Sequence, residues 1–399
     1  MRVALLSRAA YPLHDPGGLE RAVFHLAKHL AAQGVEATLF TRPATRPGVF
    51  PCEVVEVPYG ATRGLPHGRV LDRTLHYPAF ARRLGMAVAE EVRRGRVDVV
   101  HAQGLAALGY GRLRGRDTAL RAPLVMNPQG MEEHKAGGLK SLALARIKRL
   151  SREAARHADR VIATDEATRD EVPRYLGVDP GKVVVLPNGV DVGEIRESTP
   201  PDWKRVARQA LPILKTAHPV FLSVGRIEAY KGFGDILAAF ELLEETGRLP
   251  RSWAWVVVGE GRYTPALERR RRHGIAKHLS FAGRVSETLL HALYERADVF
   301  VHATRYEGSS LVTLEAMAHR LPVVATRAGG IPDKVDALTG RLVEPGDVAG
   351  LAGAIAELAS EAGLRRRLGA AGRARVVEGF TWERVARETV RLYEELLAR

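Results

Sequence analysis

Short apolar runs rich in β-branched residues alternate with helix-length segments along the chain, and this alternation most constrains the fold. It begins with an apolar run at 2–6, a loop holding Gly17 and Gly18, an amphipathic segment at 19–33 and an apolar run at 35–41. Further runs of this kind occur at 52–57, 97–101, 123–126, 160–163 and 183–186. Alternating strands and helices are typical of a parallel sheet covered by helices on both faces. The first half of the chain is therefore expected to be a doubly wound, Rossmann-like α/β domain.

A polar segment near residue 198 interrupts this alternation. Residues 197–201 read Glu-Ser-Thr-Pro-Pro, and two adjacent prolines stop a continuing helix or strand. Beyond them, strand-like runs return at 220–224, 254–258, 279–282, 299–302, 322–325 and 340–343. We therefore expect two Rossmann-like domains, over 1–198 and 199–377, and an amphipathic helix within 378–399. Two such domains in tandem create a cleft, and ligands of parallel sheets bind in loops at the carboxyl ends of strands.

Length and composition agree with a folded, two-domain protein. Single cores stop growing beyond about 250–300 residues, and the chain has 399 residues. Hydrophobic residues make up 46% and charged residues 27%, so the chain can bury a core and is not broadly disordered. The 60 basic and 46 acidic residues give a net charge of +14, which favours an anionic partner: nucleic acid, a nucleotide or an acidic membrane surface.

Cysteine content and apolar run lengths bear on the compartment. Cys52 stands alone, which excludes an intramolecular disulfide and a cysteine-based metal cage and suits a reducing compartment. The first apolar run is too short for a signal-peptide core, and no apolar stretch is long enough for a transmembrane helix. We expect a cytoplasmic protein that does not span a membrane.

The most informative motif is Glu-Gly-Ser-Ser-Leu-Val-Thr-Leu-Glu at 307–315, directly after an apolar run. A Gly-Ser-Ser loop that opens a helix points unpaired backbone N–H groups and the positive end of the helix dipole forward, and phosphate fits this position. Glu307 is expected in the loop and Glu315 inside the helix, where an apolar setting requires partners such as ligand hydroxyls. On spacing alone, an ordinary N-cap at Ser309 or Ser310 with an exposed Glu315 remains open.

Two further loops follow strand-like runs. Residues 225–232 read Gly-Arg-Ile-Glu-Ala-Tyr-Lys-Gly, in which the planar fork of Arg226 and the point charge of Lys231 together suit a diphosphate. Residues 258–261 read Val-Gly-Glu-Gly, where Gly259 would let the backbone approach a nucleotide. Taken singly, a solvated basic loop and an ordinary turn also explain these residues.

Together these motifs resemble the nucleotide-sugar-dependent glycosyltransferases of the GT-B fold, specifically the large retaining family four. The similarity is nearly continuous from 220 to 358, through the Arg/Lys loop, VVVGEG, FAGRVSE, EGSSLVTLEAMA, PVVAT, GGIPD and GRLVEPGD. It is looser in the first half, at the glycine loop, DVVHAQG, PLVMNPQG, RVIATDEATRDE and LPNGVD. The closing FTWERVA resembles the family's final helix, which implies that the segment 378–399 packs back on the first domain.

The resemblance implies roles for individual side chains. Arg226 and Lys231 would neutralise the donor diphosphate as the leaving group departs. Glu307 would hold the transferred hexose, and Glu315 would hold the ribose hydroxyls. Val285, in the loop that reads Gly-Arg-Val-Ser-Glu, would lie beside the nucleobase.

The resemblance also implies roles for the backbone. The distal phosphate would be bound by the N–H groups of Ser309, Ser310 and Leu311, while Gly17 and Gly18 would let the first domain close over the phosphates. Basic side chains and a helix terminus take the place of a metal in this scheme, and the sequence has no Asp-x-Asp motif. We therefore expect transfer without a metal or cofactor, with the nucleotide-diphosphate sugar as co-substrate.

One position departs from the family pattern. Residues 127–130 read Asn-Pro-Gln-Gly, so Gln129 stands where many members carry a histidine near the reacting sugar. Glutamine can donate and accept hydrogen bonds but cannot carry a proton. We assign Gln129 to the reacting region, with His101 and His134 as stand-ins that could contact the substrate. A structural His101 at the end of a strand and a solvated His134 are the alternatives.

Two basic stretches suggest other partners. Residues 140–156 combine apolar positions such as Ile147 with basic ones such as Arg149, which resembles relatives that act on lipid-linked acceptors at an anionic membrane surface. The alternative is that the apolar stripe packs inside the first domain. Four arginines at 269–272 have no accompanying aromatic platform or recognised module, so we expect no nucleic-acid partner.

The sequence thus predicts a retaining, metal-independent hexosyltransferase. In the family mechanism the acceptor attacks the face that the leaving group vacates, and the leaving phosphate takes the proton. The acceptor is expected to be a glycan, a lipid-linked or a small molecule in cell-envelope or glycan biosynthesis, with the enzyme cytoplasmic or peripheral on the inner face of the membrane. A nucleotide-sugar epimerase and a sugar-nucleotide-binding accessory protein with a degenerate site are the alternatives.

Overall fold

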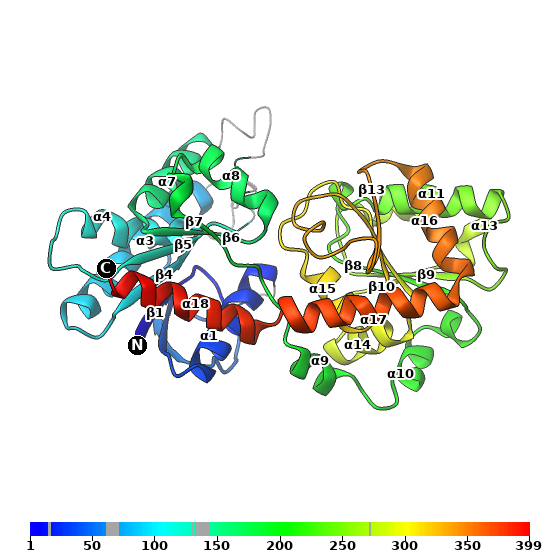
Figure 1. Cartoon of the computed structure of the whole chain (residues 1–399), viewed down its shortest axis with the longest axis horizontal. Helices are drawn as coiled ribbons and strands as arrows, with labels where there is room; N and C mark the ends of the chain where they lie inside the picture. Colours follow the sequence, from blue (N-terminus) through cyan, green and yellow to red (C-terminus); the bar gives the residue numbers. More distant parts are fainter. Residues whose placement is uncertain (15–16, 61–71, 130, 132–133, 135–143, 271–272) are drawn as a thin grey trace. The chain divides into compact units, whose positions relative to one another are not determined.

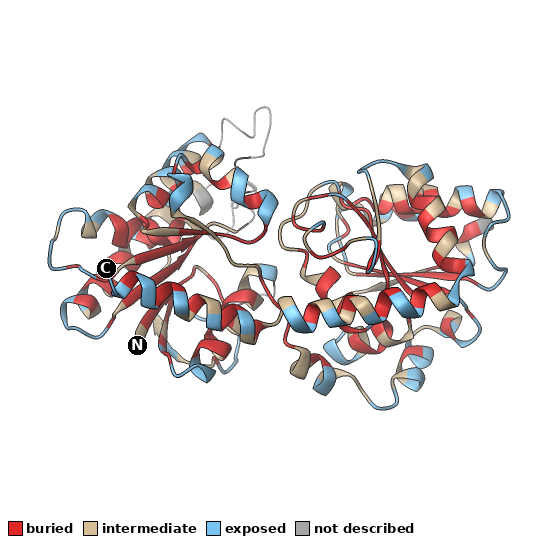
Figure 2. Ribbon diagram, in the orientation of Figure 1, coloured by how far each residue is buried: buried red, intermediate tan, exposed pale blue. Residues whose placement is uncertain are grey.

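The computed structural model describes residues 1–14, 17–60, 72–129, 131, 134, 144–270 and 273–399. These residues form two compact units (Figure 1): unit 1 comprises Met1–Asn188 and Trp382–Arg399, and unit 2 comprises Gly189–Thr381. Each unit is built on one parallel sheet, whose central strands Figure 2 shows as buried. The expected α/β class with two Rossmann-like domains is confirmed.

Unit 1 contains seven parallel strands in the order β3-β2-β1-β4-β5-β6-β7. The strands are β1 (Arg2–Leu6), β2 (Glu36–Thr41), β3 (Glu53–Glu56), β4 (Val99–Gln103), β5 (Leu124–Asn127), β6 (Arg160–Ala163) and β7 (Val183–Val185). The helices are α1 (Gly18–Ala32), α3 (Tyr77–Arg93), α4 (Ala107–Arg114), α7 (Ala145–His157), α8 (Glu166–Leu176) and α18 (Trp382–Leu397), with short turns η1 (Asp72–His76), η2 (Gly104–Ala106) and η3 (Pro180–Lys182). Alternation along β1 sorts the two faces: Val3 and Leu5 pack with α1 and α18, whereas Ala4 and Leu6 pack with α3, α4 and α7.

Unit 2 contains six parallel strands in the order β10-β9-β8-β11-β12-β13. The strands are β8 (Val220–Val224), β9 (Ala254–Val258), β10 (Leu279–Gly283), β11 (Val299–His302), β12 (Val323–Thr326) and β13 (Gly340–Val343). The helices are α9 (Val192–Ser198), α10 (Trp203–Ala210), α11 (Phe233–Glu245), α12 (Thr264–Arg270), α13 (His273–Ala276), α14 (Glu287–Arg296), α15 (Leu311–Ala318), α16 (Val348–Ser360) and α17 (Ala362–Gly379), with turns η4 (Pro212–Lys215) and η5 (Ala229–Lys231). Because β8 and β11 are neighbours at the centre, the loops after them emerge side by side at one edge of the sheet.

The units divide after Asn188 and after Thr381, whereas the sequence analysis placed the boundaries after residues 198 and 377. Helix α9 accounts for the first difference. Asp191 caps this helix, and Ile195 packs in the same buried cluster as the strands of unit 2. Helix α18 packs beside α1 in unit 1, where Trp382 and Tyr393 join the buried cluster (Figure 1).

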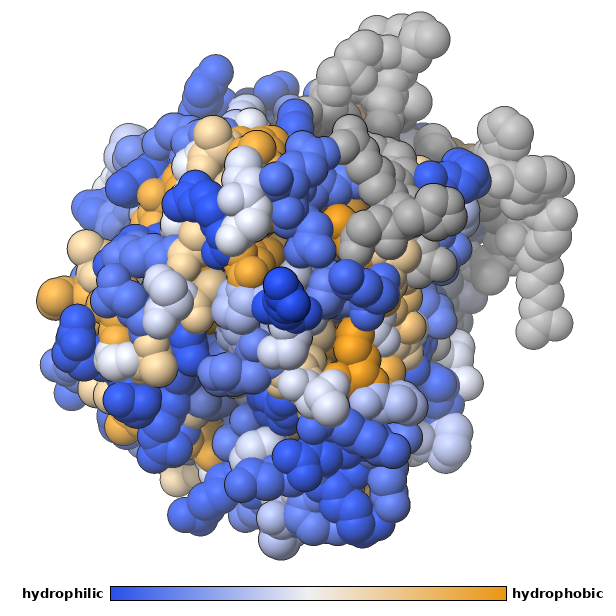
Figure 3. Space-filling model, turned by 90° about the vertical axis from the view of Figure 1, so that its right-hand side faces the viewer, coloured by the Kyte–Doolittle hydropathy of each residue, from blue (hydrophilic) through white to orange (hydrophobic). Residues whose placement is uncertain are grey.

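The surface of the described chain is largely polar. Figure 3 shows a face that is mainly hydrophilic, with hydrophobic residues in small separate groups. None of the helices in the described ranges has both the length and the apolar character needed to cross a bilayer.

Candidate functional site

Three side chains from two loops meet at the carboxyl ends of β8 and β11. Lys231 lies in the turn η5 after β8, His302 ends β11, and Glu307 lies in the loop that follows. One carboxylate oxygen of Glu307, Oε2, lies 2.7 Å from Lys231 Nζ and 2.8 Å from His302 Nε2. The sequence analysis predicted Lys231 and Glu307 for one site, and the fold brings them into contact. It missed His302, which ends an apolar run and reads as an ordinary strand residue.

The Glu307 carboxyl is strongly biased toward its ionised form. Burial by itself raises its pKa, but the hydrogen bond from His302 and the charge of Lys231 outweigh burial and hold the pKa at about 2. Because this pKa is depressed in the folded protein, the ionised carboxylate stabilises the fold above the ordinary glutamate pKa of about 4.3. That contribution is lost as the pH falls toward 2.

Close backbone packing fixes Lys231 against the β11 loop. Gly232 follows it with φ of +72°, and a Cβ at this position would overlap the carbonyl oxygen of Ala303. The backbone N–H of Arg305 also donates to the carbonyl of Tyr230 at 2.8 Å. A glycine after Lys231 is thus required by both its φ and its close approach to the neighbouring loop.

Arg226 lies in the same loop but outside this cluster of charges. Its side chain is exposed, and its guanidinium donates to the hydroxyl of Tyr230 at 3.3 Å. The Tyr230 ring also lies 5.6 Å from Lys231 Nζ. Tyr230 therefore contacts both cations that the sequence assigned to a diphosphate.

The Gly-Ser-Ser loop leads into α15 as predicted, but the cap differs from the simple alternative. Ser310 is the residue before the helix, with φ of +42°, and its hydroxyl pairs with Thr313 Oγ1 instead of capping a backbone N–H. The first N–H groups of a helix have no partner within the helix, which here concerns Leu311 and Val312, because the N–H of Thr313 already donates to the carbonyl of Ser310 at 3.1 Å. The buried hydroxyl oxygen of Ser309 makes no hydrogen bond within the described chain. These donors are available to an anionic ligand.

The two glycines of the Gly-Gly-Ile-Pro-Asp motif, Gly329 and Gly330, pack against the backbone of the loop that holds Glu307. Gly329 has φ of +52°, and a Cβ there would overlap the carbonyl oxygen of Glu307. The N–H of Gly330 donates to the carbonyl of Gly308 at 3.4 Å. The glycines therefore let two loops pack backbone to backbone.

Gly259 and Val285 lie in the loops after β9 and β10. A Cβ on Gly259, whose φ is +125°, would overlap the carbonyl oxygen of Gly225 in the Arg226 loop. Close packing against Gly225 therefore requires a glycine at this position. The approach of Gly259 to a nucleotide stays a prediction. Val285 is half-buried against the core of unit 2, and its place beside a nucleobase stays a prediction.

Glu315 has a partner that the sequence analysis did not find. The hydroxyl of the fully buried Tyr294, on α14, donates to Glu315 Oε2 at 3.0 Å. The Tyr294 ring stacks on His319, with centroids 5.2 Å apart and planes 7° from parallel. His319 in turn contacts Glu295 Oε1 at 2.8 Å and His291 at 2.9 Å. Glu315 is thus held by a buried polar network, not exposed on a helix.

If Glu315 holds the ribose, Tyr294→Phe is expected to weaken nucleoside diphosphate binding about fivefold, because one hydrogen bond of about 1 kcal/mol orients the carboxylate. Calorimetry with the diphosphate and its 2′,3′-dideoxy analogue measures the effect. The loss should vanish with the analogue. Tyr110→Phe is the matched control, since it removes a buried hydroxyl that donates to Ala122 in unit 1. Equal losses for both nucleotides would contradict the ribose role of Glu315.

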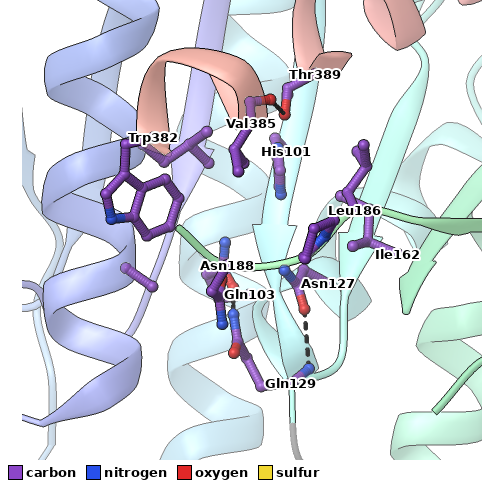
Figure 4. Close-up of a pocket in the computed structure, with 13 residues that line it drawn as sticks. His101, Gln103, Asn127, Gln129, Ile162, Leu186, Asn188, Trp382, Val385 and Thr389 are labelled. Carbon is purple, nitrogen blue, oxygen red and sulfur yellow. Dashed lines mark hydrogen bonds between the residues drawn. The ribbon is translucent and has the colours of Figure 1, made fainter. Parts of the chain in front are cut away.

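Unit 1 holds a pocket at the carboxyl ends of its central strands (Figure 4). It lies among β4, β5, β6, α1, α18 and the segment after β7. The polar lining residues are His101, Gln103, Asn127, Gln129, Asn188 and Thr389, and the apolar ones are Ala22, Leu26, Ile162, Leu186, Pro187, Trp382 and Val385. The pocket therefore combines four amides, one imidazole and one hydroxyl with seven apolar residues, one of which carries an indole.

Gln129 and His101 both line this pocket. Gln129 has φ of +57°; its backbone N–H donates to Asn127 Oδ1 at 3.0 Å, and its side-chain amide donates to Gln103 Oε1 at 3.0 Å. His101 is buried, with Nδ1 2.6 Å from the hydroxyl of Tyr393 on α18. Burial lowers the His101 pKa to about 4, so its imidazole is neutral near pH 7.

His101 both contacts Tyr393 on α18 and lines the pocket. Tyr393 is buried, and burial raises its pKa, so its hydroxyl keeps its proton. The other imidazole nitrogen of His101, Nε2, is buried and makes no hydrogen bond within the described chain. His134 does not line the pocket; it is half-buried beside the Tyr175 ring rather than fully solvated.

Gly17 and Gly18 lie at the start of α1, outside the residues that line the pocket. Gly17 precedes the helix in extended backbone, and Gly18 is exposed, with no atom near the position of a Cβ. Nothing within the described chain thus requires a glycine at 18. Its approach to the phosphates stays a prediction.

The basic stretch at 140–156 is only partly described, because 140–143 lie outside the described residues. Within α7, Ile147 and Ala154 pack in the core of unit 1, so the apolar stripe is buried as the alternative held. Arg146, Arg149 and Arg156 are exposed. The anionic membrane surface stays a prediction that now depends on this basic face alone.

Comparison with known proteins identifies the family of this chain. A family model described as Glycosyltransferase Family 4 matches residues 16–194, and one described as Glycosyl transferases group 1 matches residues 218–361. A D-inositol 3-phosphate glycosyltransferase from Streptomyces bingchenggensis is 32% identical over 99% of this chain and 90% of its own. A glycogen synthase from Mycobacterium tuberculosis is 29% identical over 98% of this chain and 94% of its own.

The fold is also found among solved structures. Sucrose-phosphate synthase from Thermosynechococcus elongatus superposes with a TM-score of 0.79 at 24% identity, covering 100% of this chain and 99% of the other. The two family matches and the full-length relatives cover both units. The chain therefore belongs to glycosyltransferase family 4, and it is a glycosyltransferase with the GT-B fold.

Proposed function

We propose that this enzyme transfers a hexose from a nucleoside-diphosphate sugar to a hydroxyl-bearing acceptor, without a metal and with retention of anomeric configuration. The observation that carries the proposal is the contact of Lys231 and Glu307 at the carboxyl ends of β8 and β11. This contact supports the proposal because a cation suited to a diphosphate lies beside a carboxylate suited to sugar hydroxyls. The N-terminus of α15 follows Glu307 closely, and so does the hydroxyl of Ser309, which makes no hydrogen bond to the described residues; both suit a distal phosphate.

Thermal unfolding with UDP-, GDP- and ADP-sugars tests the donor. A ligand at 100 times its dissociation constant stabilises the folded state by about 2.7 kcal/mol, which is readily seen as a rise in Tm. We expect the sugar nucleotide with one of the three nucleobases to raise the Tm. The same sugar nucleotide should be turned over only when an acceptor is added. No rise with any of the three would contradict the proposal, and conversion of the sugar nucleotide without an acceptor would favour an epimerase.

Transfer is expected to persist in the presence of EDTA. Arg226, Lys231 and the α15 N-terminus supply the positive charge that a divalent cation would otherwise provide to the departing diphosphate. Initial rates measured with and without EDTA should agree within error. Loss of activity that magnesium or manganese restores would overturn the metal-free mechanism.

We assign the acceptor to unit 1. Its pocket combines amides, a neutral imidazole and an indole with aliphatic side chains, and these groups suit the hydroxyls and ring faces of a saccharide or cyclitol. The names of the relatives, glycogen synthase and D-inositol 3-phosphate glycosyltransferase, support polyhydroxylated acceptors of both kinds. An α-glucan oligosaccharide and inositol phosphate are therefore the first acceptors to test.

A further inference from the structure

His302 and Lys231 share one oxygen of a buried carboxylate. Both Lys231 Nζ and His302 Nε2 contact Glu307 Oε2, and the side chains of Lys231, Glu307 and His302 are 14%, 12% and 3% exposed. The other oxygen, Oε1, accepts from the N–H of Gly308 at 3.3 Å. An ionised carboxylate in such a place requires compensating donors or charges, since burying an unpaired charge is costly.

The contact with Glu307 fixes where a proton can go on His302. An ionised carboxylate only accepts hydrogen bonds, so the Nε2 of His302 carries the hydrogen. In the neutral imidazole the other nitrogen, Nδ1, then has none. Protonation therefore adds a proton at Nδ1 and leaves the hydrogen bond to Glu307 in place.

Diphosphate binding changes the electrostatics of this cluster. Without a ligand, the positive charge of Lys231 compensates Glu307. Once Lys231 engages a diphosphate, its charge is shared with the ligand, and several negative charges arrive close to His302. Both changes favour the charged form of an imidazole that contacts the same carboxylate.

We propose that His302 is a positioning residue that holds Glu307 in its ionised, oriented form and takes up a proton from solvent when a nucleoside diphosphate engages Lys231. This inference rests on the proposed function, which assigns Lys231 to the diphosphate. It adds a proton-linked step to donor binding that no motif in the sequence indicates.

Among the described contacts of His302, Glu307 is the charged group that its imidazole touches directly. The Phe300 ring lies 6.0 Å from the imidazole on the same strand. On α15, Glu315 is bonded to Tyr294, and the neighbouring loop carries the exposed ion pair of Arg305 with Asp235. On the next strand, β12, His302 pairs with the uncharged Ala325.

Calorimetry in buffers of different ionisation enthalpy measures the number of protons taken up on binding. UDP, GDP and ADP are titrated near pH 7 into the wild type and into His302→Gln, whose amide can still donate to Glu307 but cannot titrate. We expect the wild type to take up more protons than the variant, by up to one, and to bind more tightly by the amount that this uptake contributes. Proton release from the diphosphate itself is common to both proteins and cancels in this difference.

His278→Gln is the matched control. His278 is also buried beside a carboxylate, Glu244, but it directly precedes β10 and so lies at the amino end of the sheet, away from the site. Its variant should take up as many protons as the wild type. A His302→Leu variant, which loses the hydrogen bond as well, should bind more weakly than His302→Gln.

Binding with equal proton numbers in the wild type and His302→Gln would overturn this inference and leave the proposed function standing. Absence of binding by all three diphosphates would overturn both. Nitrogen NMR of the wild type gives a readout that needs no variant to fold. The ring-nitrogen signals of His302 should report a proton gained at Nδ1 when the diphosphate binds, and unchanged signals would contradict the proposal.

Discussion

Lys231→Ala is expected to weaken nucleoside diphosphate binding about 10- to 100-fold, because a charge-assisted hydrogen bond contributes about 1.5–3 kcal/mol. Turnover should fall further, by roughly 100- to 1,000-fold, since the cation stabilises charge that develops on the leaving group. Arg226→Ala should act in the same direction on affinity. Calorimetry with the diphosphate and initial-rate kinetics with the sugar nucleotide measure the two effects separately.

Arg341→Ala is the control for loss of one positive charge from unit 2. Arg341 pairs with Glu357 at 2.8 Å on β13 and α16 and has no place in the proposed site. Its variant should bind the diphosphate as the wild type does. Wild-type affinity in Lys231→Ala would remove this residue from the diphosphate site.

Gly232→Ala is expected to lower the free energy of unfolding of unit 2 by roughly 2–5 kcal/mol. A left-handed backbone costs a residue with a Cβ about 1–2 kcal/mol, and overpacking adds about 1–3 kcal/mol. Here the added Cβ would overlap the carbonyl oxygen of Ala303. This oxygen belongs to the backbone, so it cannot rotate away as the end of a flexible side chain could. Activity should fall as well, since Lys231 is the preceding residue. Urea unfolding and initial rates measure both changes.

Gly247→Ala isolates the conformational part of this effect. Gly247 lies just after α11, with φ of +63°, and has no atom within 4 Å of a Cβ position. It should lose about 1–2 kcal/mol and keep full activity. If both variants lost the same stability, close packing against Ala303 would not be what requires the glycine.

Much of the fold follows from periodicity in the sequence. The runs at 220–224 and 299–302 coincide with β8 and β11, because strands buried on both faces read as continuous apolar runs. The boundary near 198 differs from the observed division by ten residues, because the prolines mark the end of α9, not the end of a core. Prolines show where a helix or strand ends, whereas the extent of a hydrophobic core depends on contacts between residues that are distant in sequence.

The site was predictable where a motif carries its own chemistry. Glu307, Ser309 and Glu315 stay close together in the folded chain because they belong to one loop and the helix that directly follows it. Tyr294 and Tyr393 were missed because their partners lie on other elements. His302 lies only five residues before its partner Glu307 but was missed because it ends an apolar run. The pair of His101 with Tyr393 joins residues 292 positions apart, which a local pattern cannot report.

The anomeric configuration of the product tests the central claim most directly. With Lys231 and Arg226 on the leaving diphosphate, attack on the same face can use the departing phosphate oxygen as proton acceptor. Inversion would need a base on the opposite face, and Gln129, which we assign to the reacting region, cannot act as a base. An early proton NMR spectrum of the product formed from an α-linked donor should show an α-linkage, and a β-linkage would contradict the retaining mechanism and the roles assigned to Glu307 and Gln129.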